Sequence, residues 1–226
     1  MKYDFTDFDL KKLVKNVVND NGGTKTAIDF PISVTGSSPS PASFNGVESP
    51  GTAVTLNTGT YTVSETTDPN YTASYSAGCT GTMAAGGSAT CTITNDDKAA
   101  HLIVIKTVTN NDGGSALAGA FTTTISGVTT ANPSAAGVES PGVNNTLTSV
   151  GTYSVDEGAH VGYTKTLSAD CSGSIALGET KTCTITNDDI AAHLIVIKTV
   201  TNNDGGSALA GAFTTTISGV TTAQTA

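Results

Sequence analysis

Apolar residues alternate with small polar residues in short runs along the whole chain, and glycine-rich turns separate the runs. The segment His101–Thr109 (HLIVIKTVT) is rich in β-branched residues and is followed by the turn sequence NNDGG. The segment Ala120–Ser126 places Phe121, Thr123 and Ile125 on one face. Short alternating runs that end in turn residues predict β-strands.

Further segments of the same region also have strand character. A loop rich in Pro, Gly and Ser covers Ala131–Gly142, and the strand-like segments NTLTSV, TYSVDE, YTKTLSADC and KTCTITN follow it. This gives six or seven short strands with no convincing helix between them. Such spacing predicts an all-β fold, an antiparallel Ig-like sandwich with about seven strands per unit.

The whole pattern is repeated along the sequence. A shift of 92 positions superimposes Ala191–Ala223 on Ala99–Ala131 with every residue identical, and CTITNDD occurs at both Cys91–Asp97 and Cys183–Asp189. The repeat predicts one sandwich over residues 1–97, a second over 98–189, and the first strands of a third over 190–226. We therefore expect the chain to be a piece of a longer array.

The first segment of the first unit is consistent with two structures. A helical stripe and a strand explain its apolar positions equally well, namely Leu10, Leu13, Val14, Val17 and Val18. Alignment with the second unit favours a strand over at least Leu13–Val18.

The charge of the chain limits its partners. The net charge is −9, which argues against nucleic acid and against anionic membrane surfaces. No stretch reaches the length of a membrane span. The first twelve residues, MKYDFTDFDLKK, lack the apolar core of a signal peptide.

The four cysteines form two pairs, Cys79 with Cys91 and Cys171 with Cys183, each twelve residues apart. Each pair brackets the segment that we expect to form a hairpin between the last two strands, and neighbouring antiparallel strands place cysteines within bonding distance. A zinc site is the weaker alternative because no CxxC motif is present. A disulfide in each unit indicates a compartment outside the reducing cytosol.

Strand periodicity turns three polar residues of the second unit toward the core. Lys106, Glu157 and Asn187 each share a strand face with apolar residues. The first unit has the same pattern in Lys15, Glu65 and Asn95. Buried charges need a partner or a reaction. The alternative is that the lysine reaches solvent and that the glutamate is an ordinary turn residue.

These residues lie in motifs that resemble the prealbumin-like domains of bacterial surface proteins, the Cna B-type or pilin-type modules. The matching segments are LIVIKTV, GTYSVDEGAHVGY and TITN in the second unit and YTVSETTDPNY in the first. The resemblance covers both units and the fragment, and it implies prealbumin-like sandwiches. The cysteines depart from the usual pattern, so a disulfide is an alternative staple.

The resemblance also implies an intramolecular isopeptide bond in each unit. The bonds would be Lys15–Asn95, promoted by Glu65, and Lys106–Asn187, promoted by Glu157. Burial lowers the pKa of a lysine and frees its amine as a nucleophile. A protonated glutamate would polarise the asparagine carbonyl while ammonia leaves. This is a single self-modification, so we do not expect an enzyme.

Two functions are consistent with the sequence. The first is a structural module of the cell surface, a stalk or extracellular fibre whose subunits join head to tail by strand addition. The alternative is an adhesin module that contacts a host protein or glycan through loops such as Ala131–Gly142. No cofactor is expected, except that the Asn- and Asp-rich junctions supply oxygen ligands for calcium. The same residues are common in turns.

Overall fold

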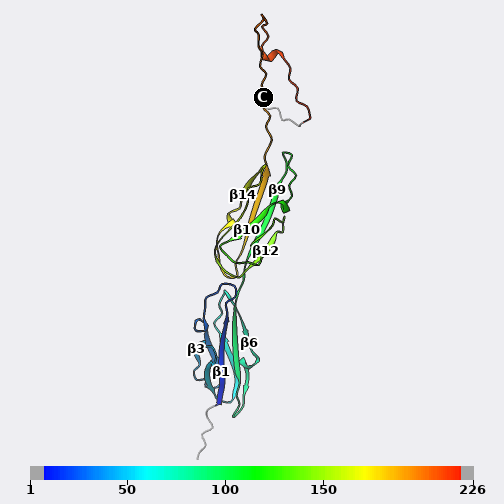
Figure 1. Cartoon of the computed structure of the whole chain (residues 1–226). Coiled ribbons are helices and arrows are strands. Elements are labelled where there is room, and N and C mark those ends of the chain that lie inside the picture. The colour runs from blue at the N-terminus through cyan, green and yellow to red at the C-terminus, as the bar shows by residue number, and fades with distance from the viewer. Residues whose placement is uncertain (1–7, 220–226) are drawn as a thin grey trace, which may run out of the picture. The chain divides into compact units, whose positions relative to one another are not determined.

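The computed structural model describes residues 8–219 and shows an all-β chain (Figure 1). These residues form sixteen strands and five short 3-10 helices, joined by turns and loops, and they contain no α-helix. Within the same range no helix is long and apolar enough to cross a membrane. The predicted all-β fold class is confirmed.

The first unit is a sandwich of two four-stranded sheets, with strand orders β4-β1-β8-β6 and β3-β2-β5-β7. Its strands are β1 Phe8–Val18, β2 Pro31–Thr35, β3 Ser43–Asn45, β4 Thr52–Leu56, β5 Gly59–Glu65, β6 Tyr71–Tyr75, β7 Thr80–Met83 and β8 Thr90–Asp97. The 3-10 helices are η1 Ala27–Asp29 and η2 Ala77–Cys79.

The second unit repeats this architecture, with strand orders β12-β9-β16-β14 and β11-β10-β13-β15. Its strands are β9 Ala100–Thr109, β10 Thr122–Ser126, β11 Ser134–Ala136, β12 Val143–Leu147, β13 Gly151–Glu157, β14 Tyr163–Leu167, β15 Ser172–Ile175 and β16 Thr180–Asp189. The 3-10 helices are η3 Ala118–Ala120 and η4 Ala169–Cys171.

The first and last strands of each unit lie side by side and run parallel. β1 pairs with β8, and β9 pairs with β16, whereas the other ladders between described strands are antiparallel. The strand by which the chain enters a sandwich is therefore next to the strand by which it leaves. This pairing positions the candidate site.

Each sandwich has its own core between its two sheets. Alternate residues of β9, Leu102 and Val104, are buried against Val155 of β13 and Ile185 of β16. The first unit has an equivalent cluster that includes Leu13, on β1. This alternation is what a half-buried strand requires.

Two sequence expectations about strands need correction. Each unit has eight strands, because the loop Ala131–Gly142 contains the three-residue strand β11 and a separate strand β15 follows η4. The N-terminal segment is the strand β1 from Phe8 to Val18, so the helical alternative is wrong. Pairing with β4 and β8 decides the matter, which local periodicity cannot do.

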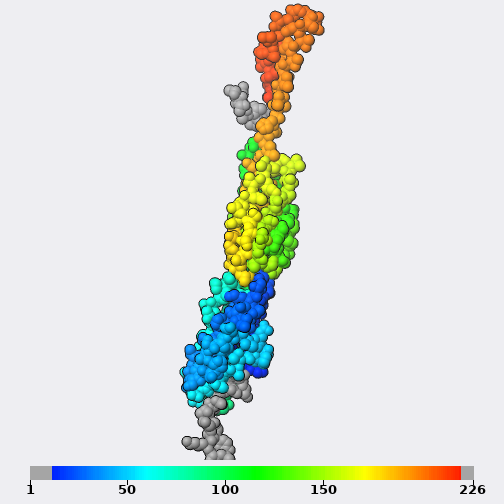
Figure 2. Space-filling model, turned by 90° about the vertical axis from the view of Figure 1, so that its left-hand side faces the viewer, coloured from blue at the N-terminus to red at the C-terminus, as the bar shows by residue number. Residues whose placement is uncertain are grey.

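The third segment forms a separate unit that begins at Ala191. The strands expected there are not formed within the described residues 191–219, where the one helical element is η5 Ala210–Ala212. Figure 2 shows this segment, in orange to red, as a narrow stretch of chain. In the second unit, β9 pairs with β12 and β16, and the described residues 191–219 contain no equivalent of either strand. Without those partners an isolated strand pair is not stable in water.

Candidate functional site

Lys106, Glu157 and Asn187, called here the unit 2 trio, lie on three different strands that face one core. Lys106 is on β9, Asn187 is on the adjacent β16, and Glu157 ends β13 in the opposite sheet. Along the parallel ladder Lys106 is opposite Ile185, two residues before Asn187. Period two then puts the lysine and the asparagine on the same face.

The unit 2 trio is sealed from solvent. The side chains of Lys106 and Glu157 are 0% and 1% exposed, and their nearest N and O atoms are 3.8 Å apart. Lys106 Nζ donates hydrogen bonds to Asn187 Oδ1 at 3.0 Å and to the carbonyl of Thr107 at 2.9 Å. Both carboxylate oxygens of Glu157 lack a hydrogen-bond partner. The trio thus places the amine of Lys106 beside both the amide of Asn187 and the carboxyl group of Glu157.

The equivalent residues Lys15, Glu65 and Asn95, the unit 1 trio, are also buried. Lys15 Nζ lies 3.3 Å from Glu65 Oε2, and Asn95 Nδ2 donates to Glu65 Oε1 at 2.5 Å. Asn95 Oδ1 is left without a partner. In the unit 1 trio the amide nitrogen faces the glutamate, whereas in the unit 2 trio the amide oxygen faces the lysine. A flip of the asparagine amide relates the two arrangements.

An aromatic ring closes each trio, and sequence reasoning did not identify it. Lys106 Nζ lies 4.4 Å from the ring centroid of Phe121, and Lys15 Nζ lies 4.5 Å from that of Phe30. Phe121 lies directly before β10 and is buried, and the sequence placed it on one strand face with Thr123 and Ile125. Its contact with a lysine on another strand could not be predicted without knowing how the strands pair into sheets.

Burial changes the acid–base character of both lysines. Desolvation lowers the pKa of Lys106 and of Lys15, and it outweighs the nearby carboxylates of Glu157 and Glu65, which act in the opposite direction. A lowered pKa increases the fraction of neutral amine, the form that attacks a carbonyl. The amines of both trios are therefore biased toward nucleophilic chemistry.

Both predicted disulfides are present. Cys79 is bonded to Cys91 and Cys171 to Cys183, with Cα atoms 4.4 Å apart in each pair. The expected hairpin between the last two strands is wrong, because β15 pairs with β13 in one sheet and β16 pairs with β9 and β14 in the other. Cys171 instead ends η4, so the disulfide fastens this helical turn to β16.

The last residue of CTITNDD has a role that the sequence did not reveal. Asp189 is buried at the end of β16 and accepts hydrogen bonds from the backbone amides of Asn111, Asp112 and Gly114, at 2.6–3.1 Å. Tyr163 Oη supports the same loop by donating to Asn110 Oδ1 at 2.6 Å. We call this arrangement the loop latch. It holds the turn that follows the first strand against the exit of the last strand.

The loop latch lowers the pKa of Asp189. Burial alone raises the pKa of this carboxyl, but the hydrogen bonds from Gly114, Asn111 and Asp112 together outweigh it. Strand parity could have indicated the residue, because Asp189 lies two positions after the inward-facing Asn187. Its partners could not be predicted, since they are backbone amides of a turn that begins 78 residues earlier.

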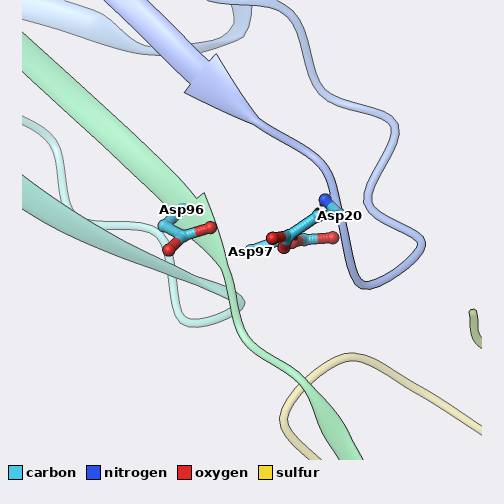
Figure 3. A group of neighbouring side chains, drawn as sticks. All are labelled: Asp20, Asp96 and Asp97. Atoms are coloured by element: carbon cyan, nitrogen blue, oxygen red, sulfur yellow. Dashed lines mark hydrogen bonds between the residues drawn. The ribbon is translucent and has the colours of Figure 1, made fainter. Parts of the chain in front are cut away.

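The first unit has the same latch, with an acidic cluster around it (Figure 3). Asp97 accepts from the amides of Asp20, Asn21 and Gly23 at 2.6–3.1 Å. The carboxylates of Asp20, Asp96 and Asp97 offer oxygen atoms that all lie within 4.8 Å of one another. In the second unit the repeat replaces Asp20 with Asn111. Calcium at the unit junctions remains a prediction.

Replacing Gly114 by Ala should open the loop latch of the second unit. A Cβ atom at Gly114 would lie 2.5 Å from Tyr163 Oη and 2.8 Å from Asp189 Oδ2, closer than side chains tolerate. We expect a loss of about 1–3 kcal/mol in the free energy of unfolding, the usual cost of overpacking. Urea unfolding measures it. Gly119→Ala is the matched control, since a Cβ there meets nothing within 4 Å. Equal effects of both substitutions would contradict the latch.

Comparisons with known proteins agree with this architecture. A family model described as a prealbumin-like fold domain matches residues 9–96 and 97–187. A search of curated proteins gives no match.

A search of the solved structures matches bacterial proteins, among them the following three. The Bacillus anthracis TIE protein is 17% identical with a TM-score of 0.46, and the match covers 82% of this chain and 34% of that one. The major pilin protein T-13 of Streptococcus pyogenes is 14% identical with a TM-score of 0.34, covering 82% and 97%. Two B repeat units of the collagen-binding protein of Staphylococcus aureus are 14% identical with a TM-score of 0.27, covering 82% and 50%.

The family match covers most of the chain and coincides with the two eight-stranded sandwiches. The chain therefore belongs to the family of prealbumin-like fold domains and carries two of them in tandem.

Proposed function

We propose that this chain is a structural module of an extracellular stalk or fibre, in which a Lys–Asn isopeptide bond clamps each sandwich. The observation that carries the proposal is the buried contact of Lys106 on the first strand with Asn187 on the last strand, beside Glu157 of the opposite sheet. A buried lysine beside a glutamate whose carboxyl oxygens lack hydrogen bonds is unfavourable as a resting state. Amide formation removes the amine and the charge.

The reaction needs no further component. The neutral Nζ of Lys106 attacks Cγ of Asn187, a C–N bond forms, and the asparagine amide leaves as ammonia. Glu157 supplies a proton to the amide group and takes one from the attacking amine, so it ends as it began. The ring of Phe121 and the apolar core exclude water, which would otherwise compete as the nucleophile.

An extracellular location is supported by the disulfides. Each sandwich has one, and disulfides persist in oxidising compartments such as the cell exterior. The motif resemblance to modules of bacterial surface proteins supports the same location. We therefore place the chain at the cell surface, with a structural role and not an enzymatic one.

The position of the bonds suits a chain under tension. Lys15 and Asn95 lie near the ends of the parallel strands β1 and β8, so a bond between them joins the entry strand to the exit strand. Pulling force would pass from β1 through the bond to the exit of β8. Residues between Lys15 and Asn95 would lie outside the force path, and the sandwich could not be extended.

Single-molecule stretching tests this role. A sandwich without its clamp would release about 80 residues, or roughly 280 Å of extended chain. We expect no release from either unit of the natural chain, and one release from the variant Asn187→Ala. A release of this length from both units of the natural chain would refute a clamped stalk.

A fibre also needs contacts between subunits. The family fold does not specify them, and we propose that copies of the chain join head to tail by strand complementation. The segment after Ala191 supports this part of the proposal, because its backbone has no strand partner within the described residues.

A further inference from the structure

The segment 191–219 exposes side chains that are buried in its twin. Leu194 and Val196 are 67% and 50% exposed, whereas the equivalent Leu102 and Val104 on β9 are 0% and 5% exposed. All residues of Ala191–Ala223 are identical to those of Ala99–Ala131. This segment could therefore make the same side-chain contacts with the other strands of unit 2 as β9 and β10 do.

The segment cannot take the place of β9 within its own chain. β9 is parallel to β16, and His101 is opposite Thr180, at the far end of β16 from Asp189. His193, the equivalent of His101, would have to travel the length of β16, about 30 Å at ~3.3 Å per residue. His193 is only four positions after Asp189, and this length of chain spans at most ~14 Å. Only the segment of a second copy can reach the position.

The segment also keeps the local arrangement that presents its lysine. Lys198 Nζ lies 4.5 Å from the ring centroid of Phe213. The distances in the two complete units are 4.5 Å for Lys15 and 4.4 Å for Lys106. The pairing of lysine with phenylalanine therefore needs only the first third of a unit, and among the described residues no hydrogen bond or ion pair joins Lys198 to a Glu or an Asn.

We propose that the segment beginning at Ala191 of one copy replaces β9 and β10 in unit 2 of a second copy, where Lys198 becomes bonded to Asn187. The covalent step rests on the function proposed above, whereas the strand exchange does not. Lys198 Nζ forms a C–N bond with Cγ of Asn187, and Asn187 loses its amide nitrogen as ammonia. Glu157 of the second copy relays the proton, as it does for Lys106.

Strand exchange competes with the folding of unit 2 around its own β9. Before the Lys106–Asn187 bond forms, β9 is held by non-covalent contacts, which include its ladders with β12 and β16, the core and the loop latch. Once the bond forms, β9 cannot leave. The intermolecular link is therefore made during folding, and its yield rises with chain concentration.

The variant Lys106→Met tests the exchange. Methionine fills the space of the lysine stem but has no amine, so Glu157 and Asn187 gain a partner only when Lys198 of another copy arrives. After refolding at high concentration, we expect multimers that survive denaturation and reduction, each link lowering the summed mass by about 17 Da. A digest should contain one peptide that joins Lys198 to Asn187. Circular dichroism and the Cys171–Cys183 disulfide report whether the variant folds.

The control carries Lys198→Met in addition to Lys106→Met and should give no covalent multimers. Covalent multimers in the control would overturn the assignment to Lys198. Multimers that form in native buffer but dissociate in denaturant would support strand exchange and contradict the isopeptide chemistry. A folded Lys106→Met chain that stays monomeric at every concentration would overturn the exchange itself.

Discussion

Replacing Glu157 by Gln should lower the unfolding temperature of the second sandwich by about 20 °C or more. Glutamine fits the same buried site but cannot relay a proton, so the bond between Lys106 and Asn187 does not form. A cross-link that closes a loop of about 80 residues contributes about 4.5 kcal/mol by the chain-entropy formula. Calorimetry measures the loss, and the first sandwich serves as an internal reference.

Two further variants serve as controls for Glu157→Gln. Glu65→Gln should lower the unfolding temperature of the first sandwich alone, because it belongs to the unit 1 trio. Glu179→Gln should change neither, since that side chain is 37% exposed and pairs with Lys181 at the surface. If Glu157→Gln lowers the unfolding temperature but the chain still loses both ammonia molecules, the glutamate acts only as a charge partner.

Replacing Cys171 and Cys183 together by Ala should cost the second sandwich about 3 kcal/mol of unfolding free energy. The bond closes a loop with a sequence separation of 12, so most of this loss comes from freedom gained by the unfolded chain. Urea unfolding of the double variant measures it. The matching pair in the first sandwich, Cys79 and Cys91, has the same separation and should lose a similar amount.

Hydrogen bonds around η4 offer a second way to hold it in place. They define the result that would contradict the prediction for the cysteine variants. Tyr153 Oη donates to the carbonyl of Asp170 at 2.7 Å, and the amide of Thr184 donates to Ser168 Oγ at 2.9 Å. If these hydrogen bonds alone hold η4 in place and the unfolded chain gains little freedom, the loss will be close to zero. That result would make the disulfide a marker of compartment and not a source of stability.

The sequence could predict the burial of the trio because strand periodicity is a property of the backbone. Lys106 lies two residues after Val104 on β9, and whatever buries one buries the other. The same rule gave the inward faces of Glu157 and Asn187. The repeat supplied the unit boundaries, since identical segments must fold alike where they have the same partners.

The features that the sequence could not predict depend on contacts between distant strands. Cys171 and Cys183 were paired correctly for a wrong reason, because the sheet to which β15 belongs is decided by its pairing with β13. The loop latch joins Asp189 to backbone amides, which have no sequence signature. The third segment shows the converse, because an identical sequence does not form strands where its pairing strands are absent from the described residues.

Intact mass under denaturing and reducing conditions tests the central claim most directly. Each isopeptide bond expels one ammonia, about 17 Da. We predict that the reduced chain is about 34 Da lighter than its sequence requires, with one loss assigned to Lys15–Asn95 and one to Lys106–Asn187 by digestion. A reduced mass equal to the sequence mass would contradict the clamped sandwich and leave each unit held by its disulfide and its core.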